Sequence, residues 1–230
     1  MAHGTSGSAG SRHPLAQAGA VLAKDLVIEY RTRFALTAVL LFAVTTLVTV
    51  SYTVGQQAGA VLQAALLWIV LYFAALSGLT RTFVAEEDGR TADALRLSAG
   101  GVAVFSGKLA FNLLLLVVLA ALLVPGFGLL MGLQVAAYGL LVAALATGCW
   151  GLAAVLTFTA ALVAQARARG ALGAVVAFPL VAPLLPMAVG AVAAAITGDP
   201  QGWAAVRGLA AYSGIMTVAG VLLFDSIWTA

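Results

Sequence analysis

Long uncharged apolar runs alternate along the chain with a few short charged stretches. No charged residue occurs between positions 34 and 80, or between positions 109 and 166. Each of these two runs is long enough for two membrane crossings, because a helix needs about 20 apolar residues to span the hydrocarbon core of a bilayer. Turn-forming residues divide the two runs near their middles, at 55–59 and 125–128. The pattern therefore predicts four helical spans, near residues 35–54, 60–80, 102–124 and 134–163.

The last third of the chain has a less regular pattern. Residues 170–198 are uncharged but contain three prolines, Pro179, Pro183 and Pro186. Prolines at this density kink or break a helix, since each lacks a backbone N–H and clashes with the preceding turn. We therefore expect a broken fifth span, a partial re-entrant or interfacial element after the break, and a sixth span, near residues 170–190, 184–203 and 205–224 respectively.

The N-terminal region differs from these spans. Residues 1–14 are small and polar, so we expect a mobile tail, followed by a single membrane domain over residues 15–230. Within 15–33, apolar and polar residues fall on opposite sides of a helical wheel: Leu15, Ala18, Leu22 and Leu26 against Gln17, Lys24 and Arg31. This pattern favours a helix that lies in the membrane interface. The alternative is an ordinary cytosolic helix that leads into the first span.

The composition is that of a membrane protein. Hydrophobic residues make up 63% of the chain and charged residues only 8%, with a mean hydropathy of +1.10. Soluble domains contain about 25% charged residues. A soluble chain of this length could not bury so much apolar surface, so we expect an all-α integral membrane protein.

The chain lacks the residues that most catalytic centres need. Its two histidines lie in the expected tail, and Cys149 is its only cysteine. A disulfide framework, a Cys/His metal site and the HExxH motif of metalloproteases are therefore excluded. Leu109 follows Gly107 and Lys108 where a phosphate-binding loop requires Ser or Thr. We predict no catalytic residue, no metal site, no ATP hydrolysis by this chain and no enzyme activity.

Basic residues are distributed unevenly between the two sides of the predicted bundle. Six spans place both termini, the segment 81–108 and the turn near 164–169 on one side. That side holds ten of the eleven Lys and Arg residues, and Arg207 is the exception. Because cytoplasmic loops are enriched in Lys and Arg, we expect both termini in the cytoplasm. The net charge of +3 is then a topology signal, and no nucleic-acid partner is expected.

The charged segment between the second and third spans is the most informative part of the chain. It begins at Arg81 and includes Glu86, Glu87 and Asp88, between two long apolar runs. Residues 91–97 can form a short helix, and acids suit the positive end of its dipole. One interpretation is a solvated loop. The other is a docking site, because a soluble ATPase would have to bind here to drive a membrane protein that has no energy source.

Ten residues in this segment and in the start of the third span form a pattern that resembles a known family. Its members are Phe83, Glu86, Glu87, Gly89, Leu95, Leu97, Ser98, Gly107, Lys108 and Asn112. This set resembles the signature of the heme exporter protein B family (CcmB), membrane subunits of the cytochrome c maturation system. Pro179 and Pro183, which follow Arg169 and Gly170, resemble the fifth span of that family. The similarity extends from about residue 15 to residue 225.

The resemblance implies an ABC-2 type permease with six transmembrane helices, an N-terminal interfacial helix and a cytoplasmic coupling segment between spans 2 and 3. It implies a homodimer in the inner (cytoplasmic) membrane, in contact with membrane lipid and with other cytochrome c maturation subunits. A cytosolic ABC ATPase subunit would bind and hydrolyse ATP, the cargo would be associated with heme, and the chain itself would hold no cofactor. The implied ATPase-coupling residues are Glu86, Glu87, Gly89, Leu95, Leu97 and Ser98.

The spans themselves leave two other functions open. An ABC-2 exporter of another lipid-like or drug-like cargo would share the architecture. A membrane scaffold that assembles partner subunits and transports nothing would share the composition.

Overall fold

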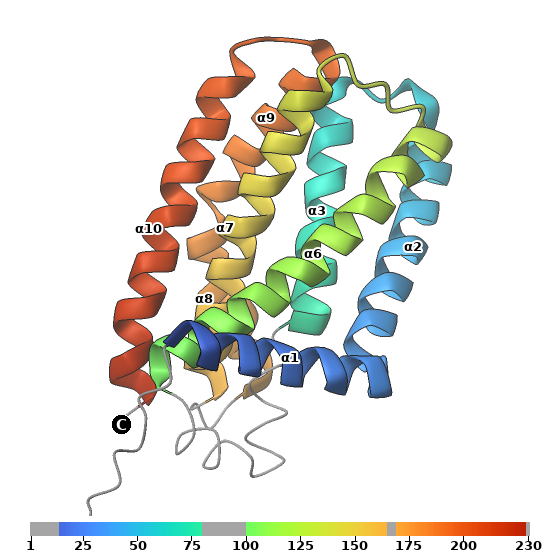
Figure 1. Cartoon of the computed structure of the whole chain (residues 1–230). Coiled ribbons are helices and arrows are strands. Elements are labelled where there is room, and N and C mark those ends of the chain that lie inside the picture. Colours follow the sequence, from blue (N-terminus) through green and yellow to red (C-terminus); the bar gives the residue numbers. More distant parts are fainter. Residues whose placement is uncertain (1–13, 80–99, 165–168, 229–230) are drawn as a thin grey trace, which may run out of the picture.

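The computed structural model describes residues 14–79, 100–164 and 169–228, and the regular elements in these ranges are all helical (Figure 1). In chain order they are α1 (Pro14–Thr32), α2 (Phe34–Val54), the short 3₁₀ helix η1 (Gly55–Gln57), α3 (Ala60–Leu79), α6 (Gly101–Met131), α7 (Tyr138–Ala164), α8 (Arg169–Val181), α9 (Leu184–Thr197) and α10 (Gly202–Trp228).

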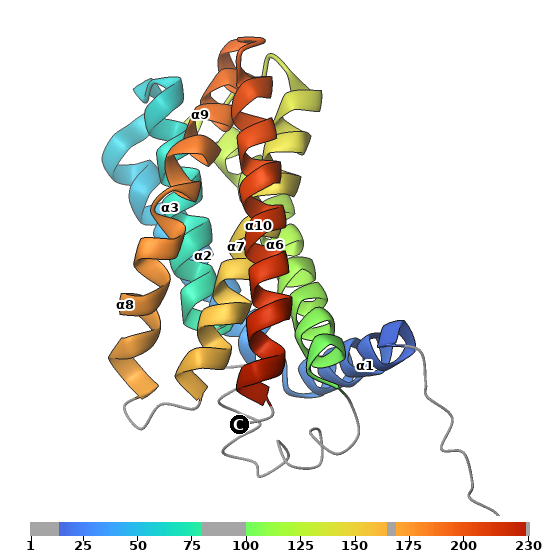
Figure 2. The ribbon, with the colours of Figure 1, turned by 90° about the vertical axis from the view of Figure 1, so that its left-hand side faces the viewer.

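Six membrane crossings can be traced through the described helices. Five helices, α2, α3, α6, α7 and α10, are each long and apolar enough to cross a membrane. Together, α8 and α9 are also long and apolar enough to cross a membrane, with a bend of 49° between them. Figure 2 shows that α8 begins at the lower end of the bundle and that α9 ends at the upper end. The pair therefore makes the fifth crossing, and the expected all-helical six-span fold is confirmed.

The break in the fifth crossing has its physical cause in its prolines. Pro183 precedes α9 with φ −75°, and Pro186 lies in the first turn of α9, where a backbone N–H has no acceptor within the helix. The helix then continues to Thr197 and ends at Gly198, which has φ 79°. The expected break is confirmed, but the expected re-entrant or interfacial element over 184–203 is wrong, because α9 runs on to the opposite end of the bundle.

The third span is longer than its sequence predicts. Pro125 lies inside α6, which continues to Met131 and ends at Gly132 with φ 65°. The predicted turn at 125–128 is therefore wrong, and the fourth span begins at Tyr138 rather than near 134. A proline removes a single backbone donor, and transmembrane helices tolerate this loss when neighbouring helices shelter the freed carbonyl.

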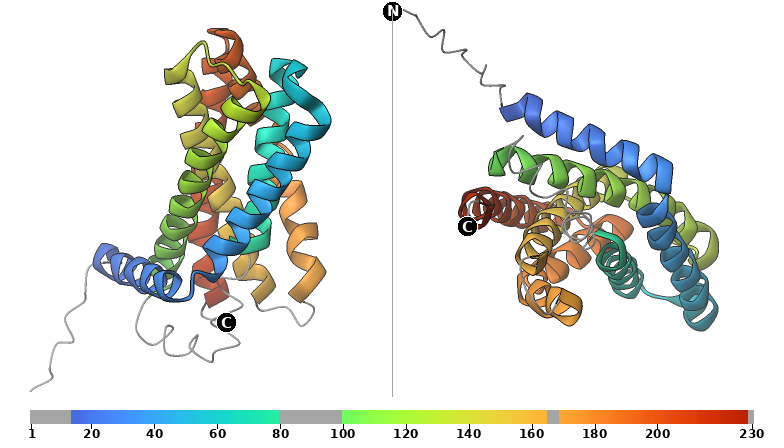
Figure 3. Two further views of the ribbon diagram at one scale, coloured as in Figure 1. Left: turned by 90° about the vertical axis from the view of Figure 1, so that its right-hand side faces the viewer. Right: turned by 90° about the horizontal axis from the view of Figure 1, so that it is seen from below.

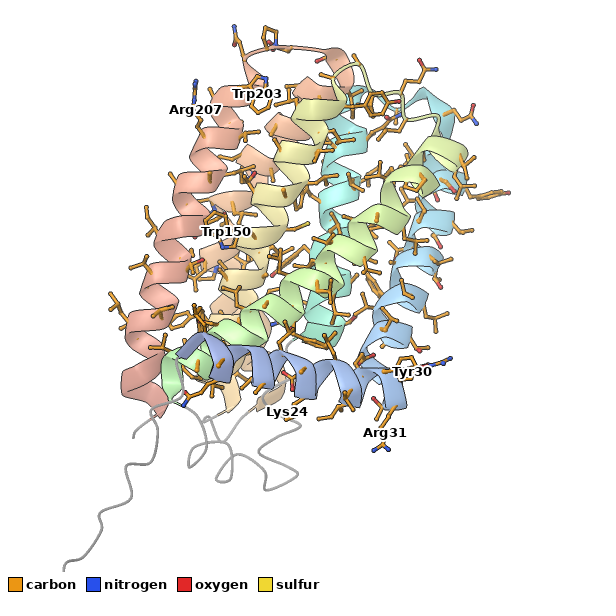
Figure 4. The ribbon with its side chains drawn as sticks, viewed as in Figure 1. Lys24, Tyr30, Arg31, Trp150, Trp203 and Arg207 are labelled. Atoms are coloured by element: carbon orange, nitrogen blue, oxygen red, sulfur yellow. The ribbon has the colours of Figure 1, made fainter. Side chains whose placement is uncertain are left out.

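The N-terminal helix lies across the lower end of the bundle rather than along it (Figures 1 and 3). Lys24 and Arg31 point away from the bundle (Figure 4), while Leu15 and Leu26 are 85% and 38% exposed. The helix packs mainly against α6. Its packed face is centred on Val21 and Asp25 rather than on the apolar stripe that the sequence suggests. The expected helix is confirmed, and its position in the membrane interface stays a prediction.

Two clusters of buried side chains hold the bundle together. The larger core joins α2, α3, α7 and α9 to most of α6, with contributions from α8 and α10. The smaller one, here called the basal cluster, comprises Val21, Val104, Phe105, Ala160, Ala161 and Phe224. It ties α1 to the lower ends of α6, α7 and α10 (Figure 1). The helix α6 is thus shared by both clusters.

Candidate functional site

The expected coupling residues and Phe83 lie outside the described residues. They belong to the segment 80–99, which follows α3 and precedes α6. Both helix ends that flank this segment, at Leu79 and Gly101, lie at the lower end of the bundle (Figure 1). The geometry of the segment's attachment can therefore be described from α6, where Gly107, Lys108 and Asn112 lie.

The helices α1 and α6 pack closely at Gly107. A Cβ atom added to Gly107 would lie 2.7 Å from the Val21 Cβ atom and 2.8 Å from the Ala18 carbonyl oxygen. Carbon atoms need about 3.5–4.0 Å, so any larger residue would separate the two helices. The glycine therefore permits the close approach of α1 to the base of α6.

Lys108, the next residue, forms a buried ion pair with α1. The residue is only 1% exposed, and its Nζ atom donates to the Asp25 Oδ2 atom at 3.1 Å. Lys24 lies 3.4 Å from the other oxygen of the same carboxylate, at the edge of the solvent. A buried ammonium group is stable only when it is paired, because transferring an unpaired charge from water into the protein is costly. The pair therefore fixes α1 on α6 in one register.

The other end of α1 is bound to α2. The Glu29 Oε1 atom accepts a hydrogen bond from the Leu36 backbone N–H at 2.7 Å, in the first turn of α2. A carboxylate suits this position, because the unpaired N–H groups of a helix N-terminus carry partial positive charge. Arg33, with φ 50°, makes the sharp change of direction between the two helices. The lower end of α2 is thus held by α1.

Asn112 lies one turn above Lys108 on α6 and contacts α7. Its Nδ2 atom donates to the Thr157 Oγ1 atom at 2.8 Å, and Thr157 in turn donates to the Ala153 carbonyl oxygen at 2.6 Å. Asn112 is fully buried, and its Oδ1 atom has no hydrogen-bond partner among the described residues. This bond joins helices inside the bundle, as polar side chains in transmembrane helices often do.

Pro179 and Pro183 belong to a different part of the molecule. Both are exposed, Pro179 within α8 and Pro183 at the bend before α9. The Tyr212 hydroxyl of α10 donates to the Leu180 carbonyl oxygen beside them. These prolines shape the fifth crossing and do not contribute to the site at the base of α6.

Asp25 and Glu29 are not among the site residues predicted from the sequence. They are the two acids that precede the charged segment, and they lie four positions apart on one helix. Residues with this spacing share a helix face, which is the signal that could have pointed to them. Within the described residues, no cluster of His, Cys, Asp and Glu could hold a metal ion.

The sequence comparisons identify the family. The family described as CcmB protein matches residues 16–225, nearly the whole chain. The chain belongs to the CcmB family. CcmB is the permease subunit of a heme exporter in cytochrome c maturation, a multi-pass membrane protein without catalytic activity that works in an ABC complex with an ATPase partner. Comparison with curated proteins and with solved structures finds no match.

Proposed function

We propose that the lower end of this CcmB subunit faces the cytoplasm and that the ATPase binds there through residues 86–98. The observation that carries the proposal is the packing of α1 against the base of α6 at this end. The segment 80–99 leads directly into the part of α6 that is fixed to α1 by the buried Asp25–Lys108 pair. A displacement of the segment would therefore reach a rigid part of the bundle.

The distribution of charge supports this orientation. Among the described side chains, α1, the α1–α2 junction and the base of α6, all at the lower end, carry the charged residues Lys24, Asp25, Glu29, Arg31, Arg33 and Lys108 (Figure 1). The connection from α9 to α10 and the start of α10, at the upper end, carry Asp199 and Arg207. Cytoplasmic ends of spans are enriched in Lys and Arg. The termini then lie in the cytoplasm, because α1 and the end of α10 share the lower end of the bundle (Figure 2).

The proposed complex contains two copies of this subunit in the inner membrane, the ATPase, and further membrane subunits of cytochrome c maturation. Heme is the proposed cargo. The proposed role of this chain is to change conformation when the ATPase binds ATP, since a ligand shifts a conformational equilibrium by its different affinities for the two states. ATP is bound by the partner, and no resident cofactor is assigned to this chain.

Charge reversal tests the docking site. We expect Glu86→Lys with Glu87→Lys to reduce the amount of ATPase that co-purifies with the permease and to reduce cytochrome c assembly. Arg207→Glu is the matched control, because it reverses an exposed charge at the opposite end of the bundle. Unchanged association and unchanged cytochrome c assembly in the double variant would refute the docking site.

Cysteine labelling tests the orientation. In a Cys149→Ala background, a membrane-impermeant maleimide should label Arg207→Cys in intact cells whose outer barrier is permeable to the reagent. It should label Lys24→Cys only after the inner membrane is opened. The reverse pattern would place the lower end of the bundle outside the cytoplasm.

A further inference from the structure

The helix α1 connects two parts of the bundle that have different surroundings. Viewed from below, it runs beside the lower end of α6 and meets α2 at its own C-terminal end (Figure 3). The lower part of α6 belongs to the basal cluster, whereas α2 lies at the edge of the bundle and packs mainly against α3 and α6. Only 17% of the apolar stretch of α2 that is long enough to cross a membrane is buried. Much of the α2 surface is therefore exposed, and α1 supplies a polar contact at its lower end.

The connection has a defined contact at each end. At the α6 end, the Asp25 carboxylate holds Lys108 at 3.1 Å, beside the close contact between Gly107 and Val21. At the α2 end, the Glu29 carboxylate accepts the Leu36 N–H at 2.7 Å. The two acids lie four positions apart, so about one turn of rigid helix separates the two contacts.

We infer that Asp25 and Lys108 are positioning residues for transport: they hold α1 as a strap that passes a displacement of the lower end of α6 on to α2. The inference rests on the proposed docking of the ATPase on residues 86–98. A force applied there enters α6 at Gly101, seven positions before Lys108. Because the pair is buried and α1 is a continuous helix, α1 moves with the base of α6. The Glu29 contact then requires the lower end of α2 to follow.

An anchoring role for the same pair would have different consequences. If Asp25 and Lys108 only stabilised the fold, removing one charge would lower the amount of folded permease, and the remaining molecules would transport normally. If the pair transmits motion, the assembled complex would still hydrolyse ATP, but less cargo would be exported for each ATP. The ratio of export to ATP hydrolysis separates these two roles.

The experiment uses the purified permease–ATPase complex for composition and ATP hydrolysis, and cells carrying the same variants for holocytochrome c. We expect Asp25→Asn to leave ATPase co-purification intact. We expect it to lower the ratio of holocytochrome c to ATPase activity about fivefold or more, because fivefold is about the lower end of typical allosteric coupling factors. Reversing the pair with Asp25→Lys and Lys108→Asp should restore part of the ratio. Arg207→Gln is the matched control, because it removes an exposed charge at the opposite end of the bundle (Figure 4) and should leave the ratio unchanged.

A second variant keeps the test decisive if Asp25→Asn does not fold. Glu29→Ala removes the contact at the α2 end and should lower the same ratio. If Asp25→Asn does fold, combining it with Glu29→Ala should add little to the loss, because both changes interrupt one connection. A loss of holocytochrome c that only follows the amount of complex, or an unchanged ratio in both single variants, would overturn the inference. Failure of the docking proposal is seen separately, as unchanged ATPase association after reversal of Glu86 and Glu87.

Discussion

Replacing Gly107 by alanine tests the close packing of α1 on α6. The added Cβ atom would lie 2.7 Å from the Val21 Cβ atom and 2.8 Å from the Ala18 backbone oxygen. A backbone oxygen cannot rotate away as a side chain can, so α1 must move. Overpacking of this kind costs about 1–3 kcal/mol, while the better helix propensity of alanine returns about 0.8–1 kcal/mol. The net loss expected for Gly107→Ala is about 0–2 kcal/mol.

Gly19→Ala is the matched control for this change. Gly19 lies on α1 itself, and a Cβ atom added there meets nothing within 4 Å. This variant should gain up to about 1 kcal/mol, so the two variants should differ by about 1–3 kcal/mol. The assay is the free energy of unfolding of the detergent-solubilised protein during titration with SDS, together with protease cleavage of α1. Equal free energies and equal cleavage in the two variants would refute the close contact.

Two further predictions concern the core of the bundle. Gly148→Ala would place a Cβ atom against the six-membered ring of the fully buried Trp68, so it should lower the free energy of unfolding by about 0–2 kcal/mol after the helix propensity of alanine is included. Gly139→Ala on the same helix meets nothing within 4 Å, and an equal loss there would contradict the packing argument. Trp150→Phe removes the 3.0 Å hydrogen bond from the indole N–H to Thr217 and should cost about 0.6 kcal/mol, the average for such bonds in membranes. A loss of several kcal/mol in the same SDS titration would contradict this prediction.

Hydropathy predicts the number of spans well because the bilayer fixes the length of apolar sequence that a helix needs. The ends of spans are harder to predict from proline and glycine alone. Pro125 lies within α6, whereas Pro183 lies at a real break. A second proline, Pro186, follows Pro183 within one turn, whereas Pro125 is the only proline in α6. Whether a lone proline ends a transmembrane helix depends on the neighbouring helices that shelter the freed carbonyl, and the local sequence does not show those neighbours.

The candidate site shows the same limit. Family resemblance singles out Gly107 and Lys108, and the structure gives a physical reason for both residues through their contacts with α1. The partner Asp25 is 83 positions away in the sequence, and no local periodicity could reveal that pairing. The apolar stripe on the helical wheel of α1 predicts the wrong packed face. The packed face includes a buried carboxylate, which a lysine on another helix stabilises.

The central claim is that this chain is a permease driven through its cytoplasmic end rather than a passive scaffold. The most direct measurement is the ATP hydrolysis rate of the ATPase subunit alone, with this permease in lipid nanodiscs, and with the Glu86→Lys, Glu87→Lys variant. The account predicts that the permease changes the rate and that the variant abolishes this change. A rate that is the same in all three samples would contradict it and would favour the scaffold.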